Sequence, residues 1–180
     1  MALMFYNLRE KFYFDTIENA SKFESHLKND PHILFWTACA TGLSGKHQQA
    51  IEKLEGLKTN HRHLDYAIIN ALIWLHEQSG LVDNDEMEVL ERNLNIAKEC
   101  TSSEAALLSA RLFLLLGRYS ETIQNLQMTD DPELPENCSI HLWLNLKAPD
   151  FCINNLLNHK KTISTHATNS NIDYLMAQAK

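Results

Sequence analysis

The stretch LFLLLGRYSETIQNL, residues 112–126, contains an apolar run that ends at Gly117 and an amphipathic segment that begins two residues later. Leu108, Leu112 and Leu115 lead up to the glycine at helical spacing. Glycine adopts positive φ without the steric cost of a Cβ atom, so it suits a tight turn at the end of a helix. The stretch therefore predicts two helices that fold back on each other at Gly117.

The composition of the 180-residue chain is that of a folded helical protein. Hydrophobic residues make up 44% and charged residues 22% of the sequence, with only 5 glycines and 4 prolines, which argues against disorder and against a turn-rich all-β fold. The formal net charge of −7 removes the electrostatic footprint expected for binding nucleic acid or an anionic membrane. The most apolar window, residues 105–116, is too short for the ~20 residues of a membrane-spanning helix.

The cysteines and the first residues of the chain bear on its compartment. The four cysteines are scattered and form no C-x-x-C motif, which predicts reduced thiols packed in a cytosolic core: Cys39, Cys100, Cys138 and Cys152. The opening stretch MALMFYNLREKF lacks the long apolar region and cleavage site of a secretion signal. We therefore expect a cytoplasmic protein.

Helix starts are marked by recognisable capping residues. Asp30 followed by Pro31 supplies a cap oxygen and a proline at the first helical position. Two S/T/D-x-x-E patterns predict capping boxes, one from Asp83 to Glu86 and one from Thr101 to Glu104. No alternating polar and apolar strand pattern is evident, so the sequence predicts an all-α fold.

The turn glycines recur with a period. Gly45, Gly80 and Gly117 each follow an apolar helix and precede an amphipathic one, and they are separated by 35 and 37 residues. Counting 34 residues back from Gly45 leads to Lys11, at a similar place before another helical segment. Such a period is typical of stacked helix pairs. The approximate units are 1–30, 31–65, 66–102, 103–136 and 137–165, with an incomplete last helix over 170–180.

Residues after the glycines argue against a chance spacing. Ala50 and Thr122 lie five residues after Gly45 and Gly117, where a small side chain lets paired helices approach closely. The pattern resembles the tetratricopeptide repeat, whose glycine, aromatic and alanine steps are matched by Gly117 with Tyr119 and by Gly45 with Ala50. The unit after Gly80 departs from it, because the longer LVDNDEMEVLERNL follows and an aspartate occupies the alanine position.

A more specific resemblance covers nearly the whole chain. The run DPHILFWTACATGLSGKHQQAIEKLEGLKTNHRHLDYAIINALIWLHEQ, residues 30–78, resembles the N-terminal repeats of the tetratricopeptide repeat protein 21 family. The later stretches LFLLLGRYSETI, IHLWLNLKAPDF and NIDYLMAQA are also similar to that family's order of helices. The family supplies the long solenoid subunit of intraflagellar transport complex A. Its members are far longer, so the chain is expected to be either a fragment or a shortened relative whose last helix frays.

The resemblance implies a fold and a role. We expect a right-handed α-solenoid of stacked tetratricopeptide-like pairs that binds other complex A subunits as a non-enzymatic scaffold. It would act in retrograde ciliary transport and ciliary cargo localisation, in the cytoplasm, the cilium and the ciliary base. Neither nucleic-acid binding nor direct membrane insertion is expected. The alternative is a generic repeat adaptor outside cilia, such as a coat subunit or a co-chaperone.

The resemblance also places certain positions of the first helix of each pair on an inner, concave face of the solenoid. Arginine and aromatic residues often anchor protein interfaces, which makes this face a candidate for binding a partner. The candidates are Phe35, Asn70, Trp74, Glu77, Leu107 and Arg111. Some of them are equally compatible with packing against a neighbouring helix.

Motifs for chemistry are incomplete. ATGLSGKH, residues 40–47, lacks the first glycine and the hydroxyl residue of a phosphate-binding loop, and no strand precedes it. Cys138 and His141 share a helical face, but with Cys152 and His159 they match no closed zinc site. Carboxylates that follow Asp83 lie at a helix start, where the helix dipole favours negative charge. We therefore expect no catalytic centre, metal site or cofactor, and a small helical enzyme or metalloprotein is the less favoured alternative.

Overall fold

The computed structural model describes residues 2–22, 29–80, 83–129 and 135–152, which form helices without any strand in these ranges. The elements, in chain order, are α1 (Ala2–Arg9), α2 (Tyr13–Lys22), α3 (Pro31–Leu43), α4 (His47–Asn60), the 3-10 helix η1 (Arg62–Leu64), α5 (Asp65–Gln78), α6 (Asn84–Glu99), α7 (Ser103–Leu115), α8 (Tyr119–Leu126) and α9 (Pro135–Lys147). This architecture confirms the predicted all-α solenoid. The predicted last helix, residues 170–180, lies outside the described residues, as does the end of the unit 137–165.

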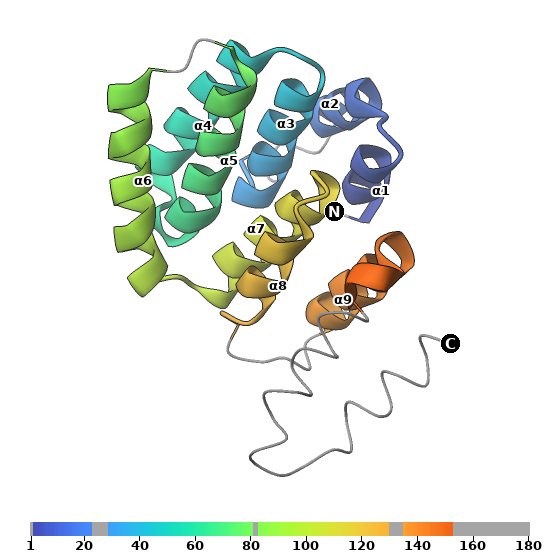
Figure 1. Ribbon diagram of the computed structural model, residues 1–180. Coiled ribbons are helices and arrows are strands. Elements are labelled where there is room, and N and C mark those ends of the chain that lie inside the picture. The colour runs from blue at the N-terminus through green and yellow to red at the C-terminus, as the bar shows by residue number, and fades with distance from the viewer. Residues whose placement is uncertain (1, 23–28, 81–82, 130–134, 153–180) are drawn as a thin grey trace, which may run out of the picture.

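Consecutive helices pack as antiparallel pairs, and the pairs follow one another in chain order (Figure 1). The pairs are α1 with α2, α3 with α4, α5 with α6, and α7 with α8. Between pairs, α2 packs on α3, α4 on α5, α5 on α7, and α7 on α9. In Figure 1, α6 forms one edge of this stack, whereas α1 and α9 lie at the opposite edge.

The turns within three of the pairs share one backbone geometry. A residue with positive φ donates its N–H to the carbonyl three residues earlier, and the next residue donates to the carbonyl five residues earlier, which is the Schellman arrangement. The residues with positive φ in these turns are Lys11 (65°), Gly45 (88°) and Gly117 (74°). Gly80, in the remaining pair, has a φ of 70°. The chain thus reverses direction at these positions.

Replacing Gly117 with alanine tests the contribution of this backbone conformation. A Cβ atom at Gly117 would meet no atom within 4 Å, so the whole effect comes from the left-handed backbone. We expect the free energy of unfolding to fall by about 1–2 kcal/mol. Urea unfolding followed by circular dichroism measures this loss. Gly117→Asn is the control and should lose less, because asparagine tolerates this conformation. Equal stability of all three proteins would contradict the expectation.

Small buried residues follow these turns at a constant distance. Thr16, Ala50 and Thr122 each lie five residues after the positive-φ residue, and each is 0% exposed. The equivalent residue after Gly80 is Asp85, which is exposed in the first turn of α6. The second helix of this pair begins at Asn84, four residues after its positive-φ residue, whereas the second helices of the other pairs begin two residues after theirs. This pair therefore has a shifted register.

Side chains cap several of the helices. The Asp30 carboxylate accepts hydrogen bonds from the N–H groups of His32 and Ile33, and Pro31 starts α3. The Asp83 carboxylate accepts from two N–H groups in the first turn of α6. Both predicted caps are confirmed.

The predicted cap at Thr101 is wrong by one residue. The Ser102 hydroxyl accepts the hydrogen bond from the Ala105 N–H at 3.1 Å and caps α7. The Thr101 hydroxyl instead donates to the Ala97 carbonyl oxygen at 2.8 Å. The Ser102 hydroxyl also donates to the His63 carbonyl oxygen at 3.0 Å, which fixes the start of α7 against η1. This long-range hydrogen bond explains the difference.

The core extends along the stack as two clusters of buried side chains. The larger cluster spans α1 to α7, and its bulkiest buried members include Met4, Leu8, Phe35, Trp36, Leu54, Ile68, Leu72, Leu75, Leu108 and Leu112. The second cluster joins α7 and α8 to α9 through Ala110, Leu114, Leu126, Ile140, Leu144 and Cys152. The apolar faces of successive pairs are thus buried against one another, as in other repeat proteins.

Candidate functional site

Two predicted binding residues lie in the core. Phe35 is 0% exposed and packs edge-to-face on Trp36, with ring centroids 5.1 Å apart. Trp74 is 6% exposed. The helices that carry them, α3 and α5, are each packed against several neighbours, so positions counted as inward-facing are covered. Phe35 and Trp74 therefore stabilise the fold rather than line an open surface.

Asn70 lies in a buried polar cluster that joins three helices. Its Nδ2 donates to the Ser109 hydroxyl at 3.3 Å, which connects α5 to α7. Burial raises the pKa of the Tyr66 hydroxyl, and the nearby amide groups of Asn70 and Asn125 partly oppose this rise. Asn125 belongs to α8, so the cluster also reaches the second helix of the next pair. Buried polar groups need such partners, which gives Asn70 a structural role.

Arg111 contributes to a cluster of aromatic side chains that joins the first and the last described helices of the stack. Its guanidinium carbon lies 5.7 Å from the ring centroid of Phe5, a cation–π contact. The Phe5 ring also packs edge-to-face on Trp36, at 5.6 Å, and on Trp143, at 5.2 Å. Residues of α1, α3, α7 and α9 therefore meet at one point. No sequence pattern singles out Phe5, because only the tertiary structure brings its ring against Trp143 of α9.

Glu77 is the predicted binding residue whose side chain is most exposed. It lies 3.5 Å from the Arg118 guanidinium, which also pairs with Glu121 at 2.8 Å. Burial alone would raise the pKa of Glu121, but the hydrogen bonds and the charge of Arg118 lower it overall. Leu107 is half-buried and packs against the second core cluster. The contacts of Arg118 with Glu77 and Glu121 connect α5 to the start of α8.

The described residues contain no group of three or more His, Cys, Asp or Glu side chains that is placed to hold a metal ion. The Glu104 carboxylate contacts the His32 imidazole, and it lies 3.9 Å from the His63 imidazole. Glu104 therefore connects the N-terminal ends of α3 and α7 with η1. The side chain of Cys138 lies outside the described part. Among the described helices, none combines the length and the apolar character that crossing a membrane requires.

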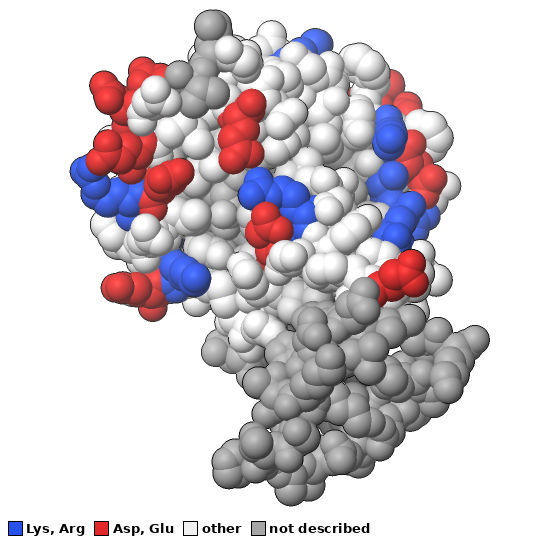
Figure 2. Space-filling model, in the orientation of Figure 1, with Lys and Arg blue, Asp and Glu red and all other residues white. Residues whose placement is uncertain are grey.

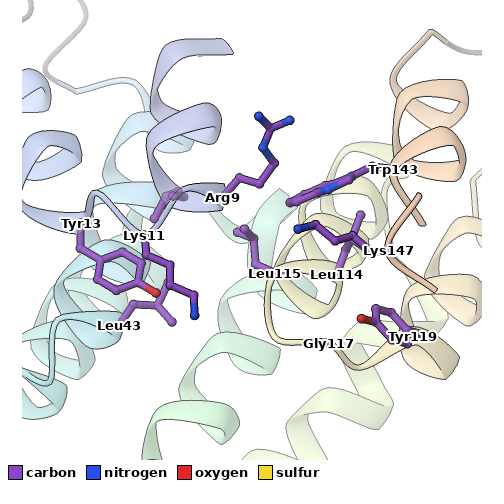
Figure 3. A pocket seen from close by; sticks show the side chains of 11 residues that line it. Arg9, Lys11, Tyr13, Leu43, Leu114, Leu115, Gly117, Tyr119, Trp143 and Lys147 are labelled. Carbon is purple, nitrogen blue, oxygen red and sulfur yellow. The ribbon is translucent and has the colours of Figure 1, made fainter. Parts of the chain in front are cut away.

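A pocket with a volume of about 160 Å³ opens where the C-terminal ends of α1, α3, α7 and α9 converge (Figure 3). Its lining combines leucines with the rings of Tyr13, Tyr119 and Trp143. Tyr119 is the aromatic residue that the repeat pattern predicts after Gly117, and both residues line the pocket. No sequence motif predicts the pocket as a whole, because its walls come from segments far apart in the chain.

The cysteines differ in accessibility, which only partly matches the expected buried thiols. Cys39 and Cys152 are buried and free, and burial raises the pKa of both thiols, whereas Cys100 is exposed at the end of α6. Because the thiolate is the reactive form, we expect iodoacetamide at pH 8 to modify Cys100 in the native protein and Cys39 only after unfolding.

Mass spectrometry of peptides from the labelled protein reports each thiol separately. The control is labelling in 8 M urea, where both residues should react. Rapid native labelling of Cys39 would contradict the placement of α3 in the core.

Comparison with known proteins gives a match over most of the chain. The family described as "Tetratricopeptide repeat protein 21 N-terminal ARM repeat" matches residues 4–180. Human tetratricopeptide repeat protein 21A is 30% identical over 122 residues, which cover 67% of this chain and 9% of the relative. Mouse tetratricopeptide repeat protein 21B is 27% identical over 120 residues, covering 66% of this chain and 9% of the relative. The chain thus corresponds to a small part of these relatives.

Proposed function

Because this chain belongs to the tetratricopeptide repeat protein 21 family, we propose that it acts as a non-enzymatic scaffold of intraflagellar transport complex A. In this role it binds other subunits of the complex and serves retrograde ciliary transport and the localisation of ciliary cargo. The observation that supports the proposal most strongly is the family match over residues 4–180.

The architecture suits a scaffold for physical reasons. Stacked helix pairs bury their apolar faces against neighbouring pairs and leave a long surface for partners. Within the stack, polar and charged contacts such as Asn70 with Ser109 and Arg118 with Glu77 connect neighbouring pairs across the core and at its rim. These contacts connect successive pairs, so the surface for partners is held in one shape.

Affinity purification from ciliated cells tests the proposal. The tagged chain is expected at the cilium and the ciliary base, and other complex A subunits should co-purify with it. The control is the Trp36→Ala variant, whose destabilised core should reduce co-purification. A folded, expressed chain that is absent from cilia and brings down no complex A subunit would overturn the proposal and favour an adaptor outside cilia.

A further inference from the structure

The pocket between the helix ends has the size of one large side chain. Its volume of about 160 Å³ is below the ~300 Å³ at which sites for whole small molecules begin. Leu8, Leu43 and Leu115 provide apolar lining, and Tyr13 and Trp143 add aromatic rings. A leucine or phenylalanine side chain would replace water here and bury apolar surface against these leucines and rings.

The charged residues that line the pocket are all basic. They are Arg9, Lys11 and Lys147, and no acidic residue belongs to the lining. Arg9 donates from Nε to Glu10 at 2.7 Å, and its guanidinium carbon lies 5.8 Å from the ring centroid of Trp143. Figure 3 shows Trp143 and Lys147 extending from α9 toward α1. The opening of the pocket therefore attracts negative charge, although the whole chain has a formal net charge of −7.

Lys11 holds a backbone conformation that glycine holds at the equivalent turns. Its φ is 65°, and it is the one non-glycine residue with positive φ in the described part of the chain. Its N–H donates to the Leu8 carbonyl oxygen as the N–H groups of Gly45 and Gly117 do in their turns. A lysine at this φ carries a steric cost that glycine avoids. Strained residues of this kind cluster at binding sites, and the Lys11 side chain lines the pocket.

We propose that this pocket binds an acidic peptide segment of a partner protein, with one apolar side chain of the segment in the pocket and flanking carboxylates paired with Lys11 and Lys147. The charge distribution favours a short segment over an extended polyanion. Figure 2 shows acidic side chains over α6 and, interspersed with basic ones, also at the opposite edge, so an extended polyanion lying across this face would meet negative charge as well. The basic lining attracts the carboxylates, and the apolar interior selects for a hydrophobic residue between them.

Fluorescence anisotropy with the purified 180-residue chain tests the proposal. The probe is a fluorescein-labelled peptide with a central leucine–phenylalanine pair and two glutamates on each side. Saturable binding that weakens as salt increases is expected. A matched peptide with lysines in place of the glutamates should not bind. Absence of saturable binding of the acidic peptide overturns the proposal.

Two substitutions separate binding from folding. Lys11→Gly should weaken peptide binding by about tenfold, which corresponds to ~1.4 kcal/mol, while it raises the urea midpoint of unfolding. Lys147→Met should weaken binding similarly, and Lys98→Met, an exposed lysine on α6, is the charge-matched control and should bind as the parent does. Unchanged affinity in both Lys11→Gly and Lys147→Met overturns the proposal.

Vesicles of phosphatidylcholine and phosphatidylserine provide the comparison with another anionic ligand. Binding to the vesicles without binding to the peptide would also overturn the proposal. The assay uses the purified chain alone, so its result is independent of membership in complex A.

Discussion

Replacing Trp36 with alanine is expected to lower the free energy of unfolding by about 3–5 kcal/mol, because the change leaves a large cavity in the core. Trp36 is 1% exposed, and its ring packs edge-to-face on Phe5 and Phe35. Such aromatic pairs add about 0.5–1.5 kcal/mol beyond the buried area. A domain of this size is stable by only about 5–15 kcal/mol, so the substitution removes a large fraction of the total stability.

Urea unfolding followed by circular dichroism measures the loss. Trp36→Phe keeps an aromatic ring in the site and should lose clearly less than the alanine variant. Leu146→Ala is the surface control, because Leu146 is 73% exposed on α9, and its effect should stay within about 0.5 kcal/mol. A Trp36→Ala protein within 1 kcal/mol of the parent would show that the core closes around the missing ring.

The helix pairs were predictable because their signals are local. Asp30 and Pro31 carry the chemistry of a helix start, and the apolar run before Gly117 carries that of a helix that ends in a left-handed turn. Both signals depend on residues within one or two turns of helix. The order of the pairs then follows from short connections, because consecutive helices pack as neighbours.

The shifted pair shows where the repeat pattern loses its predictive power. Counting from Gly80 places Asp85 at the small, buried position, but α6 begins later and exposes Asp85 to solvent. The Asp83 carboxylate fixes this start, because it accepts hydrogen bonds from two N–H groups of the first turn. A local cap therefore outweighs the period.

The inner face was not predictable from helix positions alone. Counting repeat positions along the first helix of each pair assigned Phe35 and Trp74 to an open surface. Both are buried, because α3 and α5 have neighbours on several sides. Conversely, Phe5 and Trp143 meet although 138 residues separate them in the sequence. Such contacts depend on the curvature of the whole stack, which no short motif encodes.

Two glycines inside helices should respond to alanine with opposite signs. A Cβ atom at Gly42, near the end of α3, would lie 2.3 Å from Leu75 Cδ2 and 3.4 Å from the Ala50 Cβ. Leu75 is 0% exposed, so its methyl group has little room to move. Overpacking of this kind costs about 1–3 kcal/mol, which the better helix propensity of alanine, about 1 kcal/mol, offsets only in part. We expect Gly42→Ala to destabilise the protein by up to about 2 kcal/mol.

Gly56→Ala is the matched variant, because Gly56 lies within α4 and a Cβ atom there would meet nothing within 4 Å. It should gain the full difference in helix propensity between glycine and alanine, which raises the free energy of unfolding by about 1 kcal/mol. Urea midpoints of the two variants and the parent, measured together, give the difference directly. If both substitutions stabilise the protein to the same extent, Leu75 can move aside and the close approach of α3 and α5 does not depend on glycine. Opposite signs would instead show that this position of the stack requires a residue without a side chain.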